Sequence, residues 1–446
     1  MTDPRRDLPA VNTLLEEAER RGLLNEIPRG LVVGAIRSVL EQARKEGGCE
    51  PSDGWYEAVS NLAARRRRST LFKVVNATGV VLHTNLGRAP LARAAYDAAS
   101  RAFEYSTLEL DLDSGTRGSR QTGLEELLIE VTGAEAGLVV TNAAAALFLV
   151  LNTVAGGGET VVSRGELVEI GGSFRIPEIL ARSGSVLVEV GTTNRTRLRD
   201  YTLALSPRTR AFLKVHRSNF ALVGFTEETS LEELIAAGAS RDIPTINDIG
   251  SGLLVDLSEY GLRGEPLVSH SVEAGATTVF SGDKLVGGPQ AGIIVGPKEV
   301  LAKAKSNPLA RALRPDKFTI AALEATLSLY RDADTAISEI PALAMLVAET
   351  SVLEDRAKTL CMRLPGAQII PGGSAVGGGA FPGKLLPSTL VAISSESPDT
   401  LLSELRQHDP PVIARVVDGD VVFDVRTISD EEFDIVESAV RTARSR

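Results

Sequence analysis

The sequence predicts an α/β fold, with a mostly parallel β-sheet and helices on both of its faces. Three observations lead to this class. From about residue 124 to residue 300, short apolar strands alternate with helical stretches. The chain holds 41 glycines and several alanine-rich runs, which suit tight turns between strands and helices. A hydrophobic content of 43% supports a substantial folded interior.

Length and composition set the expected organisation. A chain of 446 residues is too long for one core, and we expect a helical domain over residues 1–70, a large domain over 71–333 and a small α+β domain over 334–446. Cys49 and Cys361 lie far apart and match no metal spacing, so we expect neither a disulfide framework nor a metal site. The start has no apolar leader, and no apolar run is long enough to span a bilayer. We therefore expect a cytoplasmic protein without membrane contact.

Charge is distributed unevenly along the chain. The net charge of -10 argues against nucleic-acid binding by the protein as a whole. Residues 1–70 carry 12 Lys and Arg against 11 Asp and Glu, whereas the remainder carries 36 against 47. The positive charge of the first segment ends in the run Arg65-Arg66-Arg67-Arg68. Two interpretations of this run stay open, namely a solvated helix end and a contact with nucleic acid.

The first 70 residues show helical periodicity. Leu14, Leu15 and Ala18 fall on one helical face, and a second apolar pattern runs from residue 31 to residue 40. A Pro-Arg-Gly break at residues 28–30 separates the two helices, and two glycines end the second. A third helix is expected after Gly54, with Trp55, Val59 and Leu62 facing inward.

The segment from residue 74 to residue 90 interrupts the helical pattern. Two apolar pieces flank Asn-Ala-Thr-Gly, and polar residues follow before a helix expected near Pro90. Ligand groups in α/β enzymes lie where strands end and helices begin, so His83 and Arg88 are candidate site residues. The alternative, a structural histidine and a capping arginine, has equal weight on the sequence alone.

A phosphate site is predicted at residues 141–146. Asn142, Ala143 and Ala144 follow the expected strand 137–140 and open an alanine-rich helix over 143–154. Small side chains at a helix start let an anion reach the free backbone N–H groups, where the helix dipole also favours negative charge. A closely packed helix without a ligand is the competing interpretation, since alanine is the best helix former.

Further strands and helices complete the alternating region. Helices are expected at residues 124–131, 172–182 and 230–239, and strands at residues 160–162, 186–190, 211–216 and 245–248. The strand over 211–216 ends in His216. A histidine at the carboxyl end of a strand is a candidate to stack on or hydrogen-bond a cofactor.

The stretch Thr278–Gly292 carries the central chemical prediction. Lys284 stands on a turn between two apolar strands, where partial burial lowers the pKa of an amine and leaves it nucleophilic. Asp248 ends an earlier strand. An aspartate that holds a pyridinium nitrogen protonated and a lysine that forms a Schiff base can together flank pyridoxal 5′-phosphate (PLP). An ordinary turn lysine is the alternative.

The last 140 residues contain a basic turn, two expected helices and then a region of loops and short strands. Arg311 and Arg314 are three residues apart, so on a helical turn they would share a face and bind an oxyanion, or form a solvated basic turn. Helices are expected over 318–332 and 334–362. A glycine- and proline-rich loop is expected over 371–387, then strands at 390–393, 412–416 and 420–427 and a helix over 429–444.

Seven motifs spread along the chain belong together, and they are Leu8–Val11, Asn76–Gly79, Leu82–Arg88, Gly165–Arg175, Ser281–Leu285, Gly288–Gly292 and Asp424–Thr427. In these motifs the chain resembles the bacterial selenocysteine synthases, the L-seryl-tRNA(Sec) selenium transferases. The resemblance covers nearly the whole chain, and the histidine-to-arginine motif is quite specific. One departure is visible, because the family usually shows extra asparagines in the phosphate turn where this chain has Thr-Asn-Ala-Ala.

The resemblance implies a fold-type I PLP-dependent transferase with an N-terminal tRNA-binding domain. It implies that Lys284 forms the Schiff base with PLP, that Asp283 assists and that Asp248 pairs with the pyridine nitrogen. Ser281 would add to phosphate binding. Arg88, Arg311 and Arg314 would form the anion pocket for selenophosphate, beside the candidate His83.

The implied reaction converts L-seryl-tRNA(Sec) to L-selenocysteinyl-tRNA(Sec) with selenophosphate, through an aminoacryl-tRNA intermediate. The implied assembly is a homo-oligomer, a decamer built from dimers. Two rivals stay open: a PLP-dependent lyase or ammonia-lyase on a small amino acid or amino sugar phosphate, and a non-catalytic tRNA-binding protein. The N-terminal helical segment favours the tRNA enzyme over the first rival. The presence of both Lys284 and Asp248 speaks against the second.

Overall fold

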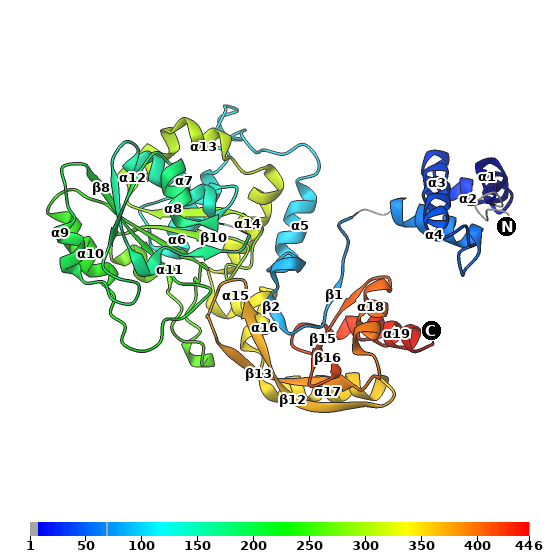
Figure 1. Ribbon diagram of the computed structural model, residues 1–446. Coiled ribbons are helices and arrows are strands. Elements are labelled where there is room, and N and C mark those ends of the chain that lie inside the picture. Colours follow the sequence, from blue (N-terminus) through cyan, green and yellow to red (C-terminus); the bar gives the residue numbers. More distant parts are fainter. Residues whose placement is uncertain (1–7, 68–69, 173, 446) are drawn as a thin grey trace. The chain divides into compact units, whose positions relative to one another are not determined.

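The computed structural model describes residues 8–67, 70–172 and 174–445 (Figure 1). The chain forms two compact units, one ending at Lys73 and the other beginning at Val74. Each unit has a hydrophobic core made of its own residues. The expected further division near residue 333 stays a prediction.

The first unit is a small helical bundle. The apolar faces predicted from the sequence meet in one core, which includes Leu14, Ala18 and Val59. Gly22 adopts a φ of 81°, which ends α1 and adds a short helix that the sequence pattern did not indicate. Its helices are α1 (Val11–Arg20), α2 (Leu23–Glu26), α3 (Arg29–Lys45) and α4 (Trp55–Arg67).

Part of the basic run stabilises this bundle. Arg66 Nη2 donates to Ser38 Oγ at 2.7 Å, and Arg67 Nη1 donates to the Glu26 carbonyl at 2.6 Å. Arg68 lies outside the described residues. These two guanidiniums hold α4 against the preceding helices, so a structural role accounts for half of the run.

A seven-stranded sheet organises the second unit (Figure 1). The strand order is β3-β11-β10-β9-β8-β4-β7, and every pairing is parallel except the two made by β11. Most of its strands are buried along their whole length, as expected for a sheet covered on both faces. The strands are β3 (Ala136–Val140), β4 (Glu159–Ser163), β7 (Val186–Val190), β8 (Thr209–Val215), β9 (Thr245–Gly250), β10 (Thr277–Ser281) and β11 (Gly292–Gly296).

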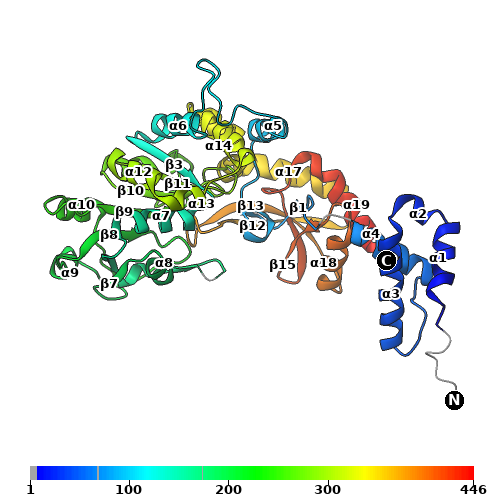
Figure 2. The same cartoon turned by 90° about the horizontal axis from the view of Figure 1, so that it is seen from above.

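Helices cover both faces of this sheet, which confirms the predicted fold class. Side chains alternate along each strand, so Phe280 packs in one core cluster and its neighbour Val279 packs in another. Figure 2 shows α6 and α14 on one side of the sheet and α8 on the other. The covering helices include α6 (Thr122–Thr132), α7 (Ala143–Ala155), α8 (Ile176–Arg182), α9 (Leu198–Leu203), α10 (Leu231–Ala239), α11 (Val268–Glu273), α12 (Lys298–Ser306) and α14 (Lys317–Leu329).

The helix expected over residues 172–182 is shorter than predicted. Strands β5 (Glu169–Ile170) and β6 (Phe174–Arg175) form a small antiparallel hairpin first. Gly171 and Gly172 adopt φ values of 25° and 74°, which turn the chain between the two strands. The helix starts at Ile176, where Pro177 in its first turn leaves no N–H unpaired.

A second sheet of five strands lies in the same unit, in the order β15-β16-β13-β12-β2. Strand β2 comes from near the start of the unit and pairs in parallel with β12. A third core cluster joins this sheet to helices α17 and α19. The strands are β2 (Val80–Leu82), β12 (Ala367–Gly377), β13 (Leu385–Ile393), β15 (Arg415–Val417) and β16 (Asp420–Asp424), and the helices that follow the large sheet are α15 (Ala333–Glu339), α16 (Pro341–Val347), α17 (Thr350–Arg363), α18 (Pro398–Gln407) and α19 (Phe433–Arg444).

Three expectations for this region were wrong. The helix expected over 334–362 is three helices, because Pro341 has no N–H for the preceding helix and starts a new one. The loop expected over 371–387 is largely the long β12–β13 hairpin, whose nine paired positions include Pro371 and Gly372. The strand expected over 412–416 is divided between β14 (Val412–Ile413), which pairs with β1 (Val75–Asn76), and β15.

Candidate active site

The site lies where three adjacent parallel strands end. Strands β8, β9 and β10 are neighbours in the sheet, so their carboxyl ends meet at one edge. His216 follows β8, Asp248 lies near the end of β9, and Lys284 stands on the turn after β10. The structure thus brings these three predicted residues together.

Asp248 and Lys284 share a buried environment, and each is 7% exposed. A Cβ built on Gly250 would lie 3.6 Å from Lys284 Nζ and 4.0 Å from Asp248 Oδ1. Burial raises the pKa of Asp248 to about 6, although the positive charge of Lys284 opposes this rise. Burial likewise lowers the pKa of Lys284, against the opposing charge of Asp248. The lysine therefore loses its proton more readily than a surface lysine does.

His216 is linked to Asp248 and faces a buried carboxylate. Its backbone N–H donates to the Asp248 carbonyl at 2.8 Å. Its Nε2 lies 3.4 Å from Glu265 Oε1, within ion-pair distance. That pair lacks hydrogen-bond geometry, and among the described residues neither atom has a hydrogen-bond partner. Two buried polar atoms are therefore available to a ligand.

Asp283, the residue before Lys284, binds the side chain of Arg88. Arg88 Nη1 donates to Asp283 Oδ2 at 2.5 Å, and Ser281 Oγ donates to the other carboxylate oxygen at 2.5 Å. Arg88 has a φ of 62°, unusual for a residue with a side chain, and its Nε is buried without a partner in the described part of the chain. Asp283 thus holds the guanidinium beside the lysine turn.

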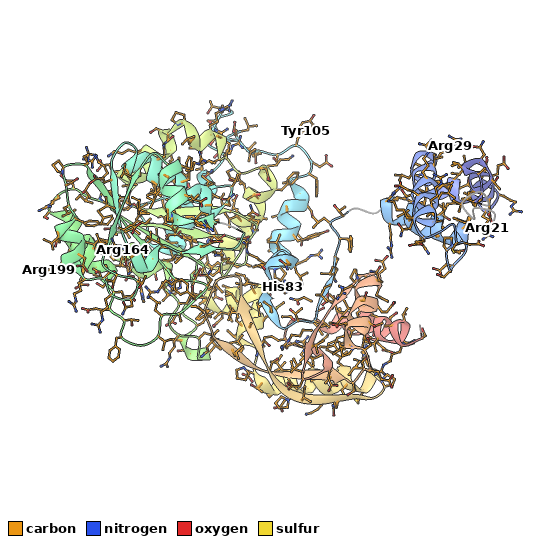
Figure 3. The ribbon with its side chains drawn as sticks, in the orientation of Figure 1. Arg21, Arg29, His83, Tyr105, Arg164 and Arg199 are labelled. Atoms are coloured by element: carbon orange, nitrogen blue, oxygen red, sulfur yellow. The ribbon has the colours of Figure 1, made fainter. Side chains whose placement is uncertain are left out.

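His83 lies between the two sheets of this unit, as Figure 3 shows. It precedes a short 3₁₀ turn over Thr84–Leu86, and its carbonyl accepts the N–H groups of Leu86 and Arg88 at 3.0 Å. The helix expected near Pro90 is α5 (Arg93–Arg101). His83 Nδ1 is buried and lacks a hydrogen bond from any described residue.

The turn before α7 has the features of an anion site. Asn142 caps the helix, and its side chain accepts the Ala145 N–H at 2.9 Å. The N–H groups of Ala143 and Ala144 have no hydrogen-bond acceptor among the described residues. Gly292 of β11 passes so close that an added Cβ would lie 2.0 Å from the Asn142 carbonyl oxygen. The sheet therefore holds this helix start in place.

Within the described chain, Arg88 and Arg314 have different acidic neighbours, Asp283 and Glu109. Arg311 is exposed on α13 (Pro308–Ala312). Arg314 lies beyond the end of that helix, so the expected shared helical face was wrong, and its Nη1 lies 3.6 Å from Glu109 Oε1. The Leu313 carbonyl accepts the Thr141 N–H at 3.0 Å, which joins this basic turn to the start of α7.

Besides Glu265, two further site residues, Ser218 and Gly379, were not identified from the sequence. Ser218 is 1% exposed, and its Oγ lacks a hydrogen bond within the described chain. A Cβ built on Gly379 would lie 3.0 Å from that Oγ and 3.8 Å from Lys284 Nζ. The glycine run 377–379 signalled only a loop, because nothing in the local sequence placed it beside a strand end some 160 residues earlier in the chain.

The donor set of this edge fits PLP. A buried amine with a lowered pKa suits the aldehyde, and a buried carboxylate suits a protonated ring nitrogen. Free N–H groups at the start of α7 suit the phosphate. Within residues 8–67, 70–172 and 174–445, no group of three or more His, Cys, Asp or Glu side chains could hold a metal ion. The described residues also contain no helix long and apolar enough to cross a membrane.

Comparison with known proteins connects this geometry to a family. The family model described as L-seryl-tRNA selenium transferase matches residues 74–429, and a second, described as selenocysteine synthase N terminal, matches residues 5–44. A relative from Geobacter sulfurreducens named L-seryl-tRNA(Sec) selenium transferase is 49% identical, over 98% of this chain and 99% of its own. Relatives of the same name from Geobacter metallireducens and Nitratidesulfovibrio vulgaris are 48% and 47% identical, each over at least 97% of both chains.

A solved structure, D-glucosaminate-6-phosphate ammonia-lyase, shares the fold. Its TM-score is 0.59 at 20% identity, over 84% of this chain and 96% of that one. A likeness at this identity concerns the fold alone, so it does not favour the lyase alternative. The two family models together span both units, and the relatives match almost the full length. The chain therefore belongs to the L-seryl-tRNA(Sec) selenium transferase family.

Proposed function

We propose that this protein uses PLP and selenophosphate to convert L-seryl-tRNA(Sec) into L-selenocysteinyl-tRNA(Sec). The observation that carries the proposal is the buried pair of Lys284 and Asp248 at the strand edge of a chain from this family. We further propose a cytoplasmic homo-oligomer, a decamer built as a pentamer of dimers. The division into residues 1–70, 71–333 and 334–446 belongs to the same proposal.

The residues of the strand edge have complementary roles toward the cofactor. Lys284 Nζ would hold the aldehyde carbon and Asp248 the ring nitrogen, while His216 would contact the ring. The N–H groups of Ala143 and Ala144 at the Asn142 cap would bind the phosphate, and Ser281 would join them if its hydroxyl turns away from Asp283 when the cofactor binds. When bound, PLP supplies an electron sink for the bonds of the seryl α-carbon.

Lys284 is the proposed base of the reaction. Its lowered pKa leaves a fraction of the amine neutral nearer to physiological pH than for an ordinary lysine. The neutral Nζ can accept the proton of the α-carbon and return a proton to the departing β-hydroxyl. Asp283 assists by holding Arg88 at 2.5 Å, so its role is to position rather than to transfer a proton.

Arg88, Arg311 and Arg314 are the proposed ligands of selenophosphate, with His83 beside them. Guanidiniums bind phosphate-like oxyanions through paired hydrogen bonds. Arg88 Nε and His83 Nδ1 are buried polar atoms without hydrogen bonds in the described chain, which supports an incoming ligand. Arg311 is exposed and so remains available to a charged group.

The first unit is the proposed tRNA-binding module. Arg29, labelled in Figure 3, is an exposed arginine at the start of α3, and Arg37 and Arg44 are exposed further along the same helix. Contacts of such residues with RNA phosphates would depend strongly on salt concentration. Arg66 and Arg67 contribute to the fold of the unit and are weaker candidates.

The product assay tests this function. Purified protein with PLP, seryl-tRNA(Sec) and selenophosphate should form selenocysteinyl-tRNA(Sec), measured after hydrolysis of the ester. Lys284→Ala should lower the rate by at least about 10²–10⁴-fold, the usual contribution of a positioned base. Lys303→Ala is the matched control, because Lys303 is an exposed lysine on α12 that pairs with Glu299. Product formation by Lys284→Ala at the wild-type rate would overturn the assignment.

A further inference from the structure

The tip of the β12–β13 hairpin reaches the lysine at the edge of the large sheet. Gly377, Gly378 and Gly379 have φ values of 77°, 60° and 76°, a left-handed run that side chains disfavour. A Cβ on Gly379 would lie 3.8 Å from Lys284 Nζ. The second sheet thus contributes backbone, rather than a side chain, at this point of the site.

Two contacts hold this tip in place. A Cβ on Gly378 would lie 2.8 Å from the Cβ of Leu82, the last residue of β2, so the loop lies directly on that strand. On the other side, Glu265 Oε2 accepts the N–H of Phe381 at 2.6 Å. Phe381 is itself held at a φ of 46°. The tip is therefore anchored by both a strand and a buried carboxylate.

Neutral hydrogen-bond donors collect beside the lysine. The backbone N–H groups of Gly378 and Gly379 have no acceptor among the residues that the structure describes, and both glycines are partly exposed. The hydroxyl of Ser218, on a residue that is 1% exposed, likewise lacks a partner in that part of the chain. Unpaired buried donors are rare in folded proteins, so the Ser218 hydroxyl points to a ligand atom, and the two partly exposed N–H groups are free to bind the same atom.

The charges around this pocket disfavour a free carboxylate. Asp248, Asp283 and Glu265 all lie close enough to Lys284 to act on its charge. The neighbouring guanidinium, Arg88, is paired with Asp283 through Nη1, and its remaining donors are those proposed to bind selenophosphate. A carboxylate ligand calls for an arginine that is free to form paired hydrogen bonds. An ester carbonyl carries no charge and needs only neutral donors.

The arginines of the second sheet do not supply the positive charge that a carboxylate ligand would need. Arg426 donates to the carbonyls of Met345 and Pro387 at 2.5 and 2.6 Å. Arg415 donates to the Gly373 carbonyl at 2.9 Å. The two guanidiniums thus donate to backbone carbonyls of the second sheet and of α16, and the groups of the hairpin tip that lie beside Lys284 are backbone groups of its glycines.

We propose that Ser218 and the N–H groups of Gly378 and Gly379 bind the ester carbonyl of the seryl group, and that this neutral pocket selects esterified serine over free serine. The inference rests on the proposed function, since only an aminoacyl ester presents the seryl carbonyl without a negative charge. Ser218, Gly378 and Gly379 are then specificity-determining residues of the reaction.

The test is a titration of the PLP-loaded, full-length enzyme with L-serine methyl ester and with L-serine at one pH, followed by the visible absorption of the cofactor. The wild type should respond to the ester at a lower concentration than to free serine. Ser218→Ala should raise the half-saturating ester concentration about 2–10-fold, the effect of one neutral hydrogen bond, and leave that of free serine unchanged. Gly379→Ala, which places a methyl group 3.0 Å from Ser218 Oγ, should do the same.

Two matched controls accompany these variants. Ser306→Ala removes an exposed hydroxyl on α12 that bonds the Lys303 carbonyl. Gly373→Ala adds a methyl group on the same hairpin, where the nearest atom would lie at 3.6 Å. Both should titrate like the wild type. Ser218→Ala gives up no hydrogen bond within the described chain, so its melting temperature should also match the wild type.

Three outcomes would overturn the pocket. If Ser218→Ala raised the half-saturating concentrations of the ester and of free serine equally, the hydroxyl would contribute to the binding of both and not to the choice between them. If the spectrum of Ser218→Ala changed without any ligand, the hydroxyl would contact the cofactor instead. If Ser218→Ala and Gly379→Ala both titrated with the ester like the wild type, these residues would not contact the ester carbonyl. In each case the unaltered enzyme would still respond to seryl-tRNA(Sec). A wild type that responds to neither the ester nor seryl-tRNA(Sec) would instead contradict the proposed function itself.

Discussion

Lys284 and Asp248 change each other's ionisation because both are buried at the same strand edge. Desolvation lowers the lysine pKa and raises that of the aspartate to about 6, and each charge opposes the shift of the other. Above about pH 6 the carboxylate is therefore ionised, and it favours the protonated form of Lys284. The reactivity of the amine depends on both groups.

Asp248→Asn should therefore move the reactivity of Lys284 to lower pH. The amide removes the negative charge that raises the lysine pKa, while burial, which lowers it, remains. The rate at which apoenzyme takes up PLP, followed by visible absorption from pH 6 to pH 10, should rise at a lower pH in the variant. Asp256→Asn is the control, because Asp256 is an aspartate bound to Ser258 away from the strand edge. A midpoint that stays in place or rises would contradict the coupling.

The sequence predicted those site residues that carry a local signal. Lys284, Asp248 and His216 end or follow strands, and parallel strands place their carboxyl ends together. Ser218 and Glu265 carry no such signal. Their relevance comes from burial without hydrogen bonds and from a hairpin more than 100 residues further along the chain. Only the three-dimensional fold could reveal these contacts.

At the scale of elements, the start of α7 combines a helix cap with the proposed phosphate site. The side chain of Asn142 satisfies the N–H of Ala145, so the N–H groups of Ala143 and Ala144 remain for an anion. The close approach of Gly292 to the Asn142 carbonyl fixes this helix start against β11. One residue thus stabilises the helix and shapes the proposed phosphate site.

Two substitutions at Asn142 should separate these effects. Asn142→Ala removes the cap and should cost about 0.5–2 kcal/mol of stability, measured by denaturant unfolding of the apoenzyme. Asn142→Asp keeps a capping oxygen but places a negative charge beside the proposed phosphate site. It should weaken PLP binding by about tenfold or more, because like charges at such range repel by about 1–4 kcal/mol. Unchanged PLP affinity in Asn142→Asp would move the phosphate elsewhere.

Element boundaries were predicted best where a strong local signal exists. The helix expected over residues 230–239 matches α10, which begins at Leu231 after a capping box formed by Ser230 and Glu233. The continuous helix expected over 334–362 did not form, because Pro341 restarts the chain in a new helix. The β12–β13 hairpin was missed because its glycines and prolines are typical of loops. Here the pairing between the two strands decides the structure instead.

At the scale of the whole molecule, the chain consists of two independently packed units. The first unit has its own helical core, and the second contains all the site residues from His83 to Gly379. The net charge is nearly balanced in the first 70 residues and strongly negative in the rest, so the catalytic unit alone is a poor ligand for RNA. This charge difference supports the proposal that the first unit binds the tRNA.

The most direct measurement is the visible absorption spectrum of the purified PLP-loaded protein, titrated separately with seryl-tRNA(Sec) and with free serine. We predict a cofactor band that changes with the charged tRNA and not with the same concentration of serine. A protein without residues 1–70 should keep the resting band and lose the response to tRNA. A band that responds to free serine but not to seryl-tRNA(Sec), or no band after PLP is added, would contradict a PLP enzyme that acts on seryl-tRNA(Sec).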